Sequence, residues 1–201
     1  MIRVIVFDFG NVIYTVHRER FIKNISRFTD TSAQDLELMI YGPLGPSHQY
    51  ETGLITSDQF FKKIVSIAHL SVSKPDFIKT FIDMFEPIPT TPRLIRQLKP
   101  NYTLALLSNT NEWHFEHVIQ PLEDYDLFDH VTLSYEVKAM KPAKKIYQDA
   151  VKKSKMNPEE CVFIDDVKEY ADAASEMGIH GIQYTSHDAL LESLRHVGVK
   201  V

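Results

Sequence analysis

The stretch "VIVFDFGNVI", residues 4–13, decides the fold. It opens with an uninterrupted run of β-branched and aromatic residues, which is typical of a strand buried on both faces. Asp8 ends this run, and Gly10 and Asn11 then allow a tight turn. The pattern predicts a buried strand whose carboxyl end presents the Asp8 carboxylate to a reaction centre.

The composition limits what the chain can be. With 201 residues, 44% of them hydrophobic, it can bury about 70% of its unfolded surface, which suits one domain plus a smaller module. A formal net charge of -5 argues against a nucleic-acid or anionic-membrane partner, because either calls for a basic face. We therefore expect a small-molecule partner, no nucleic acid and no membrane, with monomer and homodimer both open.

The number of cysteines and the length of the apolar runs indicate where in the cell the protein is expected. Cys161 is the only cysteine, so no internal disulfide can form, and its place in the run "CVFID" predicts a buried thiol. Neither a signal peptide nor an apolar stretch of about 18 residues is found. These features predict a soluble cytoplasmic protein.

Four further apolar runs resemble the first and stand at residues 102–108, 130–135, 161–166 and 181–185. Each borders a segment with helical spacing, so the C-terminal half alternates strand and helix. Such alternation is typical of a parallel sheet with helices on both faces. We predict an α/β fold with a three-layer, Rossmann-like parallel-sheet core.

Residues 18–85 have a different character, because their apolar residues recur at helical spacing and turn residues interrupt them. Thr56 offers one of the helix starts. We predict a small all-helical cap at 15–87, inserted after the first strand, and a core domain formed by 1–14 and 88–201. An aromatic stripe is expected to form the hydrophobic core of this cap: Phe60, Phe61, Phe77, Phe81 and Phe85.

Polar side chains stand at the carboxyl ends of three predicted strands. They are Asp8, then Ser108 with Asn109, then Asp165 with Asp166. Open parallel sheets bind ligands beyond these ends, so we expect the side chains to converge. Carboxylate oxygens suit Mg²⁺, and hydroxyl or amide donors suit phosphate oxygens. The sequence therefore predicts a site for a divalent cation and a phosphoryl group.

Four motifs, in this order, resemble those of the haloacid dehalogenase-like hydrolase superfamily: "VIVFDFGNV", "LALLSNTN", "KAMKP" and "CVFIDD". Most members of that family are Mg²⁺-dependent phosphatases that form an aspartyl-phosphate intermediate. The helical insert resembles the small cap of one branch. The combination "DFGNV", "LLSNTN" and "FIDD" is especially similar to the α-D-glucose-1-phosphate phosphatase-like subgroup of sugar-phosphate phosphatases. The resemblance implies a phosphomonoesterase that acts on a small organic phosphate, with Mg²⁺ as cofactor.

The resemblance also implies a role for each motif residue. Asp8 would be the nucleophile, and Lys141 would neutralise both it and the phosphate. Ser108, Asn109 and Lys141 would bind phosphate oxygens. The implied metal ligands are Asp8, the backbone carbonyl of Gly10, Asp165 and Asp166. Lys138 stays open as the alternative lysine, and Ser108 could also cap the following helix. Which of Asp165 and Asp166 contacts the metal directly is open too.

Gly10 departs from the family pattern, which has an acid/base Asp two residues after the nucleophile. Metal binding through the backbone would survive, whereas a missing general acid costs about 10²- to 10⁴-fold in rate. Two explanations keep the protein catalytic. Either an anomeric sugar phosphate provides an easy leaving group, or a cap residue replaces the acid/base. The candidates are His17, His48 and Glu51, which sequence does not rank and which also suit an ordinary surface.

Two other functions stay open. A degenerate site could bind a phosphorylated ligand without turning it over, although binding alone does not require a nucleophile such as Asp8. A 2-haloacid dehalogenase also lacks the second Asp. Its metal-free site would gain nothing from the uncompensated charges of Asp165 and Asp166, which argues against that function.

Three further features bear on the site. Tyr170 stands where many relatives carry Asn, which weakens the expected support of the acidic loop. His114 and His117 could form a metal pair, but with no third ligand nearby we interpret them as helix surface. Substrate specificity is expected to reside in the cap loop at residues 41–53.

Overall fold

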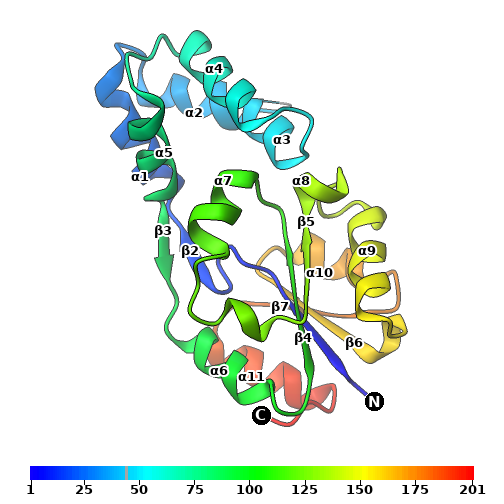
Figure 1. The fold of residues 1–201 in the computed structure, drawn as a ribbon. Coiled ribbons are helices and arrows are strands. Elements are labelled where there is room, and N and C mark those ends of the chain that lie inside the picture. The colour runs from blue at the N-terminus through cyan, green and yellow to red at the C-terminus, as the bar shows by residue number, and fades with distance from the viewer. Residues whose placement is uncertain (44) are drawn as a thin grey trace.

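The computed structural model describes residues 1–43 and 45–201; Leu44, in the loop expected to set specificity, lies outside the described residues. Five strands form a parallel sheet (Figure 1): β5 (His130–Leu133), β4 (Thr103–Ser108), β1 (Val4–Phe7), β6 (Cys161–Asp165) and β7 (His180–Gln183), in this spatial order. Every residue of β1 and β6 is buried, Cys161 included. The continuous apolar runs therefore predicted the sheet correctly.

Four helices cover the two faces of the sheet: α6 (Thr90–Leu98) and α11 (His187–His196) on one, α9 (Lys144–Ser154) and α10 (Lys168–Ser175) on the other. Alternate residues of a strand point to opposite faces. Ile5 and Phe7 accordingly lie in the hydrophobic cluster with α6 and α11, and Val4 and Val6 lie in the cluster with α9 and α10. The predicted three-layer, Rossmann-like core is confirmed.

Short helical elements stand between the longer ones in both the core and the cap. They are α7 (Glu112–His114), a π-helical turn (Phe115–Ile119), α8 (Ser134–Val137) and 3₁₀ turns at Ser26–Phe28, Tyr125–Leu127 and Pro158–Glu160. Helix α7 is capped by Asn111, whose Oδ1 accepts a hydrogen bond from the His114 N–H at 3.1 Å. Ser108 instead belongs to β4, so the alternative that it caps this helix is wrong.

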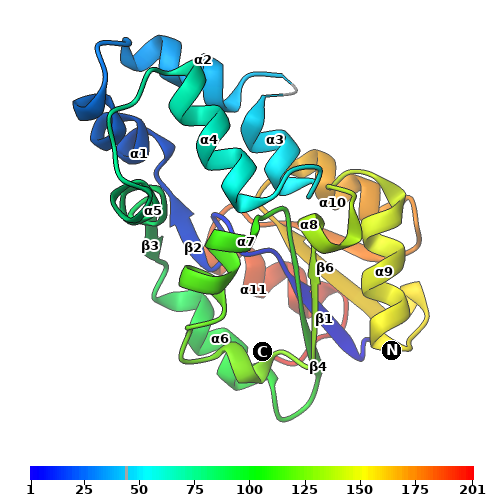
Figure 2. The same cartoon turned by 45° about the horizontal axis from the view of Figure 1, so that its top comes forward.

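Five helices form the cap, which rises above the sheet in Figure 1 and turns toward the viewer in Figure 2: α1 (Arg18–Ile25), α2 (Ala33–Tyr41), α3 (Pro46–Glu51), α4 (Ser57–Ile67) and α5 (Lys74–Ile82). Helix α4 begins with a capping box, since Thr56 Oγ1 accepts from the Gln59 N–H and Gln59 Oε1 accepts from the Thr56 N–H. The predicted helix start at Thr56 is therefore confirmed.

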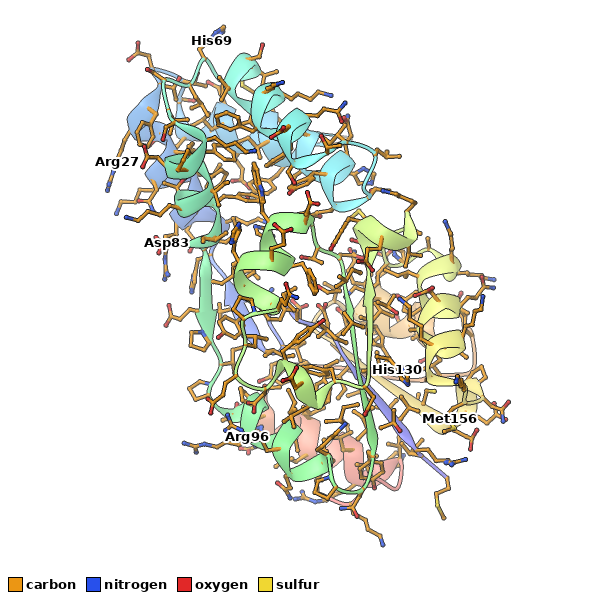
Figure 3. The ribbon with its side chains drawn as sticks, viewed as in Figure 1. Arg27, His69, Asp83, Arg96, His130 and Met156 are labelled. Carbon is orange, nitrogen blue, oxygen red and sulfur yellow. The ribbon has the colours of Figure 1, made fainter. Side chains whose placement is uncertain are left out.

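The cap has a hydrophobic core of its own. Phe60, Phe77 and Phe81 are fully buried in it, as predicted, and Phe61 and Phe85 pack at its edge. Trp113 of α7 enters the same cluster from the core domain, with its ring 6.1 Å from that of Phe60. Figure 3 shows the side chains that fill this region, with Arg27 and His69 at the end of the cap remote from the core. Trp113 thus fixes the cap to the loop that follows β4.

A two-stranded antiparallel ribbon joins cap and core: β2 (Tyr14–Val16) pairs with β3 (Phe85–Pro87). The all-helical description of residues 15–87 missed this ribbon, because three-residue strands carry too little pattern to be read locally. Strand β2 crosses the expected boundary between residues 14 and 15, whereas β3 ends at the expected boundary after residue 87. The division into 1–14 with 88–201 and 15–87 stays a prediction. Within the described ranges, no helix is long and apolar enough to cross a bilayer.

Candidate active site

The carboxyl ends of β1 and β6 bring Asp8 and Asp165 to one edge of the sheet, and the loop before α9 places Lys141 between them. The Lys141 Nζ lies 2.8 Å from Asp8 Oδ1 and 2.5 Å from Asp165 Oδ2. All three side chains are buried. The rings of Phe163 and Tyr170 lie 5.4 and 5.3 Å from the ammonium. The predicted departure at Tyr170 therefore places an aromatic face against Lys141.

Burial and charge act against one another in this cluster. Burial raises the pKa of the Asp8 carboxyl to about 7, the Lys141 ammonium opposes that shift, and Asp165 adds to it. Burial also disfavours the charged form of Lys141, but the charges of Asp8 and Asp165 outweigh it and raise the Lys141 pKa. One ammonium thus faces two carboxylates, and a further positive charge would favour the ionised form of Asp8.

A group of three carboxylates is placed to hold that charge. Oxygens of Asp8, Asp165 and Asp166 all lie within 4.8 Å of one another, and no other such group of acidic, His or Cys side chains occurs among the residues described. Mg²⁺ prefers oxygen ligands of this kind, so the donor set fits the ion implied by the sequence. Asp165 uses both oxygens in protein contacts, with the Lys141 ammonium and the Val167 N–H. Asp166 accepts a hydrogen bond on Oδ2 from Asn11.

Asn11 does more than tolerate a tight turn. Its φ of 55° is left-handed, which Asn accepts more readily than most residues. Its Nδ2 donates to Asp166 Oδ2 at 3.0 Å, and its Oδ1 accepts from the Val16 N–H at 3.1 Å. Burial raises the pKa of Asp166, and the bond from Asn11 opposes this. Asn11 therefore orients an expected metal ligand from the nucleophile loop.

Asn109 positions the backbone of Lys141. Its Oδ1 accepts from the Lys141 N–H at 2.8 Å, and its Nδ2 donates to the Lys141 carbonyl at 3.2 Å. The amide oxygen and one of the two Nδ2 hydrogens are thereby engaged, and phosphate binding by the remaining N–H stays a prediction. Helix α9 begins at Lys144, three residues after Lys141. Lys138 donates instead to the Gly53 carbonyl at 2.6 Å, so it is not the lysine of this cluster.

The backbone does not dictate a glycine at position 10. The φ of Gly10 lies outside the left-handed region, and an added Cβ would meet a single neighbour, Val16 Cγ2, at 3.3 Å. A Cβ at this position would therefore need only a small shift of Val16. Neither the backbone conformation nor the space at the first side-chain atom explains the absence of the acid/base Asp.

A cavity of about 520 Å³ opens above the charge cluster, between core and cap. The core contributes the nucleophile loop, Ser108 and Lys141 to its wall, and Ser108 is almost fully buried there. The cap and ribbon contribute both polar and apolar groups: Val16, Arg18, Glu19, Tyr41, Glu51, Met84 and Phe85. A small ester therefore fits between the nucleophile and the cap.

Of the three cap residues named from sequence, Glu51 borders this cavity and the two histidines do not. His48 is exposed on α3. His17 lies 3.0 Å from the carboxylate of Glu19 and 3.4 Å from that of Glu86. The structure thus ranks candidates that the sequence left equal.

The interpretation of His114 as helix surface is wrong. The residue is buried, stacks on Phe81 with ring centres 4.2 Å apart, and contacts Asn111 through Nδ1 at 3.0 Å. Burial lowers its pKa to about 3, so it is neutral. His117 is exposed, and neither histidine belongs to a metal-binding group within the described part of the chain.

Three residues with a part in this site carry no motif. Arg18 and Tyr41 line the cavity, with the guanidinium 4.9 Å from the centre of the Tyr41 ring. Ser134, directly after β5, contacts the backbone of both Glu51 and Thr110. A polar residue at the end of a predicted strand was a usable signal for Ser134. Arg18 and Tyr41 gave no local signal, because their place depends on how the cap helices pack.

Comparison with known proteins agrees with this geometry. The model of the haloacid dehalogenase-like hydrolases matches residues 2–178. The chain belongs to that family. The predicted hydrolase class is thereby confirmed, as is the resemblance on which it was based.

Two relatives and one more distant structure are informative. A D-ribitol-5-phosphate phosphatase of Bacteroides thetaiotaomicron is 29% identical over 192 residues, which cover 91% of this chain and 92% of that protein. The crystal structure of a family enzyme from the same organism, in complex with magnesium and inorganic phosphate, has a TM-score of 0.82 at 27% identity and covers 93% of this chain and 96% of its own. An L-2-haloacid dehalogenase, at 18% identity and a TM-score of 0.63 over 89% of this chain and 84% of its own, shares the fold.

Proposed function

We propose that this protein is a Mg²⁺-dependent phosphomonoesterase that hydrolyses a small sugar or polyol phosphate through an aspartyl-phosphate on Asp8. The observation that carries the proposal is the group of three carboxylates, two of them paired with the Lys141 ammonium, beside a cavity between core and cap. The similar enzyme with bound magnesium and phosphate, and the D-ribitol-5-phosphate phosphatase, support the same activity.

Each residue has a task that its position supports. The ionised Asp8 attacks phosphorus, while Lys141 orients that carboxylate and neutralises phosphate oxygens. Ser108, buried at the end of β4, donates to a phosphate oxygen. Asp8, Asp165, Asp166 and the Gly10 carbonyl would hold Mg²⁺, which supplies charge neutralisation for the phosphoryl group. Asp166 is the better placed of the adjacent pair for direct contact, because Asp165 already bonds through both oxygens.

The two other functions find less support. A metal-free dehalogenase would bury a substrate carboxylate beside three carboxylates that share one ammonium, which is electrostatically costly. A purely binding protein would not need a nucleophile held against a lysine in this way. We therefore propose a hydrolase that acts on a small-molecule phosphate ester in the cytoplasm. We expect a monomer or homodimer that binds neither nucleic acid nor a membrane.

The cavity wall favours a hydroxylated substrate. Arg18, Tyr41 and Glu51 offer donors and acceptors on the cap side, where the group esterified to phosphate would lie. A hydrocarbon chain would leave these groups without partners, at a cost of about 1–3 kcal/mol for each that becomes buried. A sugar or polyol phosphate satisfies them, which agrees with both the sugar-phosphate subgroup and the ribitol-phosphate relative.

The experiment is phosphate release from a panel of esters with Mg²⁺ and with EDTA. The panel contains ribitol 5-phosphate, glucose 1-phosphate, glucose 6-phosphate and farnesyl phosphate. We expect Mg²⁺-dependent turnover of at least one sugar or polyol phosphate and little of the farnesyl ester. Failure to release phosphate from any ester would contradict the proposal, and halide release from 2-haloacids in EDTA would replace it with dehalogenation.

A further inference from the structure

The cavity contains few groups that could replace the acid/base missing at position 10. Six titratable residues of its wall lie outside the cluster of Asp8, Lys141 and Asp166. They are Arg18, Glu19, Tyr41, Glu51, His114 and Tyr170. An acid/base for this chemistry must exchange a proton near neutral pH and face the group leaving phosphorus.

Five of the six fail one of these requirements. The Arg18 guanidinium offers hydrogen-bond donors and no acceptor, so it does not serve as a base. The Glu19 side chain is 75% exposed and pairs with His17, so it points toward solvent. His114 is packed between Phe81 and Phe85 in its neutral form. Burial raises the pKa of both Tyr41 and Tyr170 above that of an ordinary phenol, so neither exchanges a proton near pH 7.

Glu51 remains, and the segment that carries it is fixed to the core. We call residues 50–53 the docking segment, because each of them contacts the core domain. The contacts are Tyr50 Oη with the Trp113 N–H (3.1 Å), the Glu51 carbonyl with Ser134 Oγ (2.6 Å), Thr52 Oγ1 with Met140 Sδ (3.1 Å) and the Gly53 carbonyl with Lys138 Nζ (2.6 Å). Four successive contacts hold the segment in place relative to the sheet.

The partners of the docking segment lie beside the phosphate-binding residues. Ser134 also contacts Thr110, two residues after Ser108, and Met140 directly precedes Lys141. Gly53 permits this close approach, because a Cβ there would lie 2.1 Å from the Tyr135 carbonyl. The backbone of Glu51 is therefore tied to the same two loops that present Ser108 and Lys141.

The surroundings of the Glu51 side chain suit proton exchange. Its enclosure by protein raises the carboxyl pKa to about 7, against Arg18 and the Ser47 hydroxyl, which both lower it. Arg18 of α1 is the charge that faces it, Tyr41 of α2 is near, and Ser47 lies on its own helix at 3.3 Å. From the core, α8 reaches only its backbone carbonyl, through Ser134. A group with this pKa is both a usable acid and a usable base at neutrality.

We infer that Glu51 is the catalytic acid/base of this enzyme, which acts from the cap in place of the absent side chain at Gly10. The inference rests on the proposed phosphatase function. Asp8 borders the cavity from the core and Glu51 borders it from the cap, and in-line displacement requires the leaving group to lie on the side of phosphorus away from Asp8.

Glu51 gives up one proton in the first half-reaction and takes one back in the second. In the first, an Asp8 oxygen forms a bond to phosphorus, the bond from phosphorus to the ester oxygen breaks, and that oxygen takes the proton of Glu51. In the second, Glu51 takes a proton from water, whose oxygen bonds to phosphorus as the Asp8–phosphorus bond breaks. Alcohol and inorganic phosphate are released, and both carboxyl groups return to their starting forms.

The decisive experiment compares Glu51→Gln with wild type on two leaving groups. A polyol phosphate needs a proton on its leaving oxygen, whereas p-nitrophenyl phosphate releases a stable phenolate and does not. We expect kcat/KM for the polyol phosphate to fall about 10²- to 10⁴-fold in Glu51→Gln. For the aryl ester it should stay within about threefold. A burst of nitrophenol should precede slow turnover, because the phosphorylated Asp8 lacks its base.

Controls separate this role from others. Glu37→Gln, which removes an exposed carboxylate of cap helix α2 outside the cavity, should leave both substrates unchanged. Gly10→Asp in the Glu51→Gln background should restore polyol phosphate turnover, since it supplies a carboxyl next to the nucleophile and its Cβ meets only Val16. In wild type, the ratio of kcat/KM for the polyol ester to that for the aryl ester should decline above a pH of about 7, and Glu51→Gln should remove this decline.

These experiments separate failure of the inference about Glu51 from failure of the proposed phosphatase function. If wild type releases no phosphate from any ester, the phosphatase proposal itself fails. If wild type is active and Glu51→Gln loses both substrates equally, Glu51 only positions the substrate and the inference is overturned. The same follows if Glu51→Gln retains polyol phosphate turnover, or if the wild-type ratio is independent of pH.

Discussion

Replacing Lys141 by Met removes the one ammonium that separates two buried carboxylates. Asp8 and Asp165 would then face each other without compensation, at 4.8 Å or less. The repulsion of two unit charges at that distance is about 3.5 kcal/mol for an effective dielectric constant near 20. This agrees with the cost of about 3–5 kcal/mol for breaking a buried ion pair.

The variant can avoid this repulsion by protonating one of the two carboxylates, at a free-energy cost that depends on pH. Relative to an unfolded carboxyl with a pKa near 3.9, protonation costs about 1.5 kcal/mol at pH 5 and about 5.6 kcal/mol at pH 8. Burial already raises the pKa of Asp8 to about 7 in wild type, so at pH 5 both proteins carry a protonated Asp8 and this cost cancels between them. At pH 8 both carboxylates are ionised and the variant loses about 3.5 kcal/mol, so the loss should grow by about 3.5 kcal/mol across this range.

Urea unfolding in EDTA at pH 5 and pH 8 measures this difference directly. Lys138→Met is the matched control, because Lys138 is exposed and donates only to the Gly53 carbonyl. It should show a small loss that does not depend on pH. An equal loss for Lys141→Met at both pH values, or no loss at pH 8, would refute the electrostatic reasoning. Phosphate release by Lys141→Met should fall at both pH values, because the nucleophile loses its partner.

Three further predictions follow from the same site. Asp8→Asn should abolish phosphate release from aryl and polyol esters alike, while Mg²⁺ still raises the melting temperature, because Asp165 and Asp166 remain. Asn11→Gly keeps the left-handed backbone but deletes the donor to Asp166, so the Mg²⁺ concentration for half-maximal activity should rise about 10- to 100-fold, with kcat recovered at saturation. In EDTA, burial raises the pKa of Asp8 from 3.8 to about 7, so its contribution to the free energy of unfolding is present below pH 3.8 and is lost as pH rises through 7. Added Mg²⁺ should consequently stabilise the protein more at pH 8 than at pH 5 in thermal melts.

Most of the core could be predicted from the sequence because its strands are buried on both faces. Each appears as a continuous apolar run, and parallel order then places the carboxyl ends together. The ribbon of Tyr14–Val16 and Phe85–Pro87 could not be predicted, since its pairing joins segments about seventy residues apart. The buried position of His114 was missed for a related reason, because Phe81 and Phe85 cover it from the cap.

The site divides in the same way. Asp8, Lys141, Asp165 and Asp166 follow from motifs that each lie within a few residues of a strand end. Glu51 could be named but not ranked, because its distance from the nucleophile depends on how α3 docks on α8. The hydrogen bond between Asn11 and Asp166 spans 155 residues and leaves no local pattern.

If the acid/base lies on the cap, proton transfer to the leaving oxygen depends on the position of the cap. With an Asp at position 10, proton transfer would belong to the same rigid loop as the nucleophile. With Glu51, the proton reaches the leaving oxygen only while residues 50–53 stay bound to Trp113, Ser134, Met140 and Lys138. The carboxyl itself lies among cap residues, with Arg18 and Ser47 facing it, and burial there raises its pKa to about 7. The cap therefore sets the pKa of the acid, whereas the contacts of residues 50–53 with the core set its position, and departure of the cap would carry the proton donor away from the leaving oxygen.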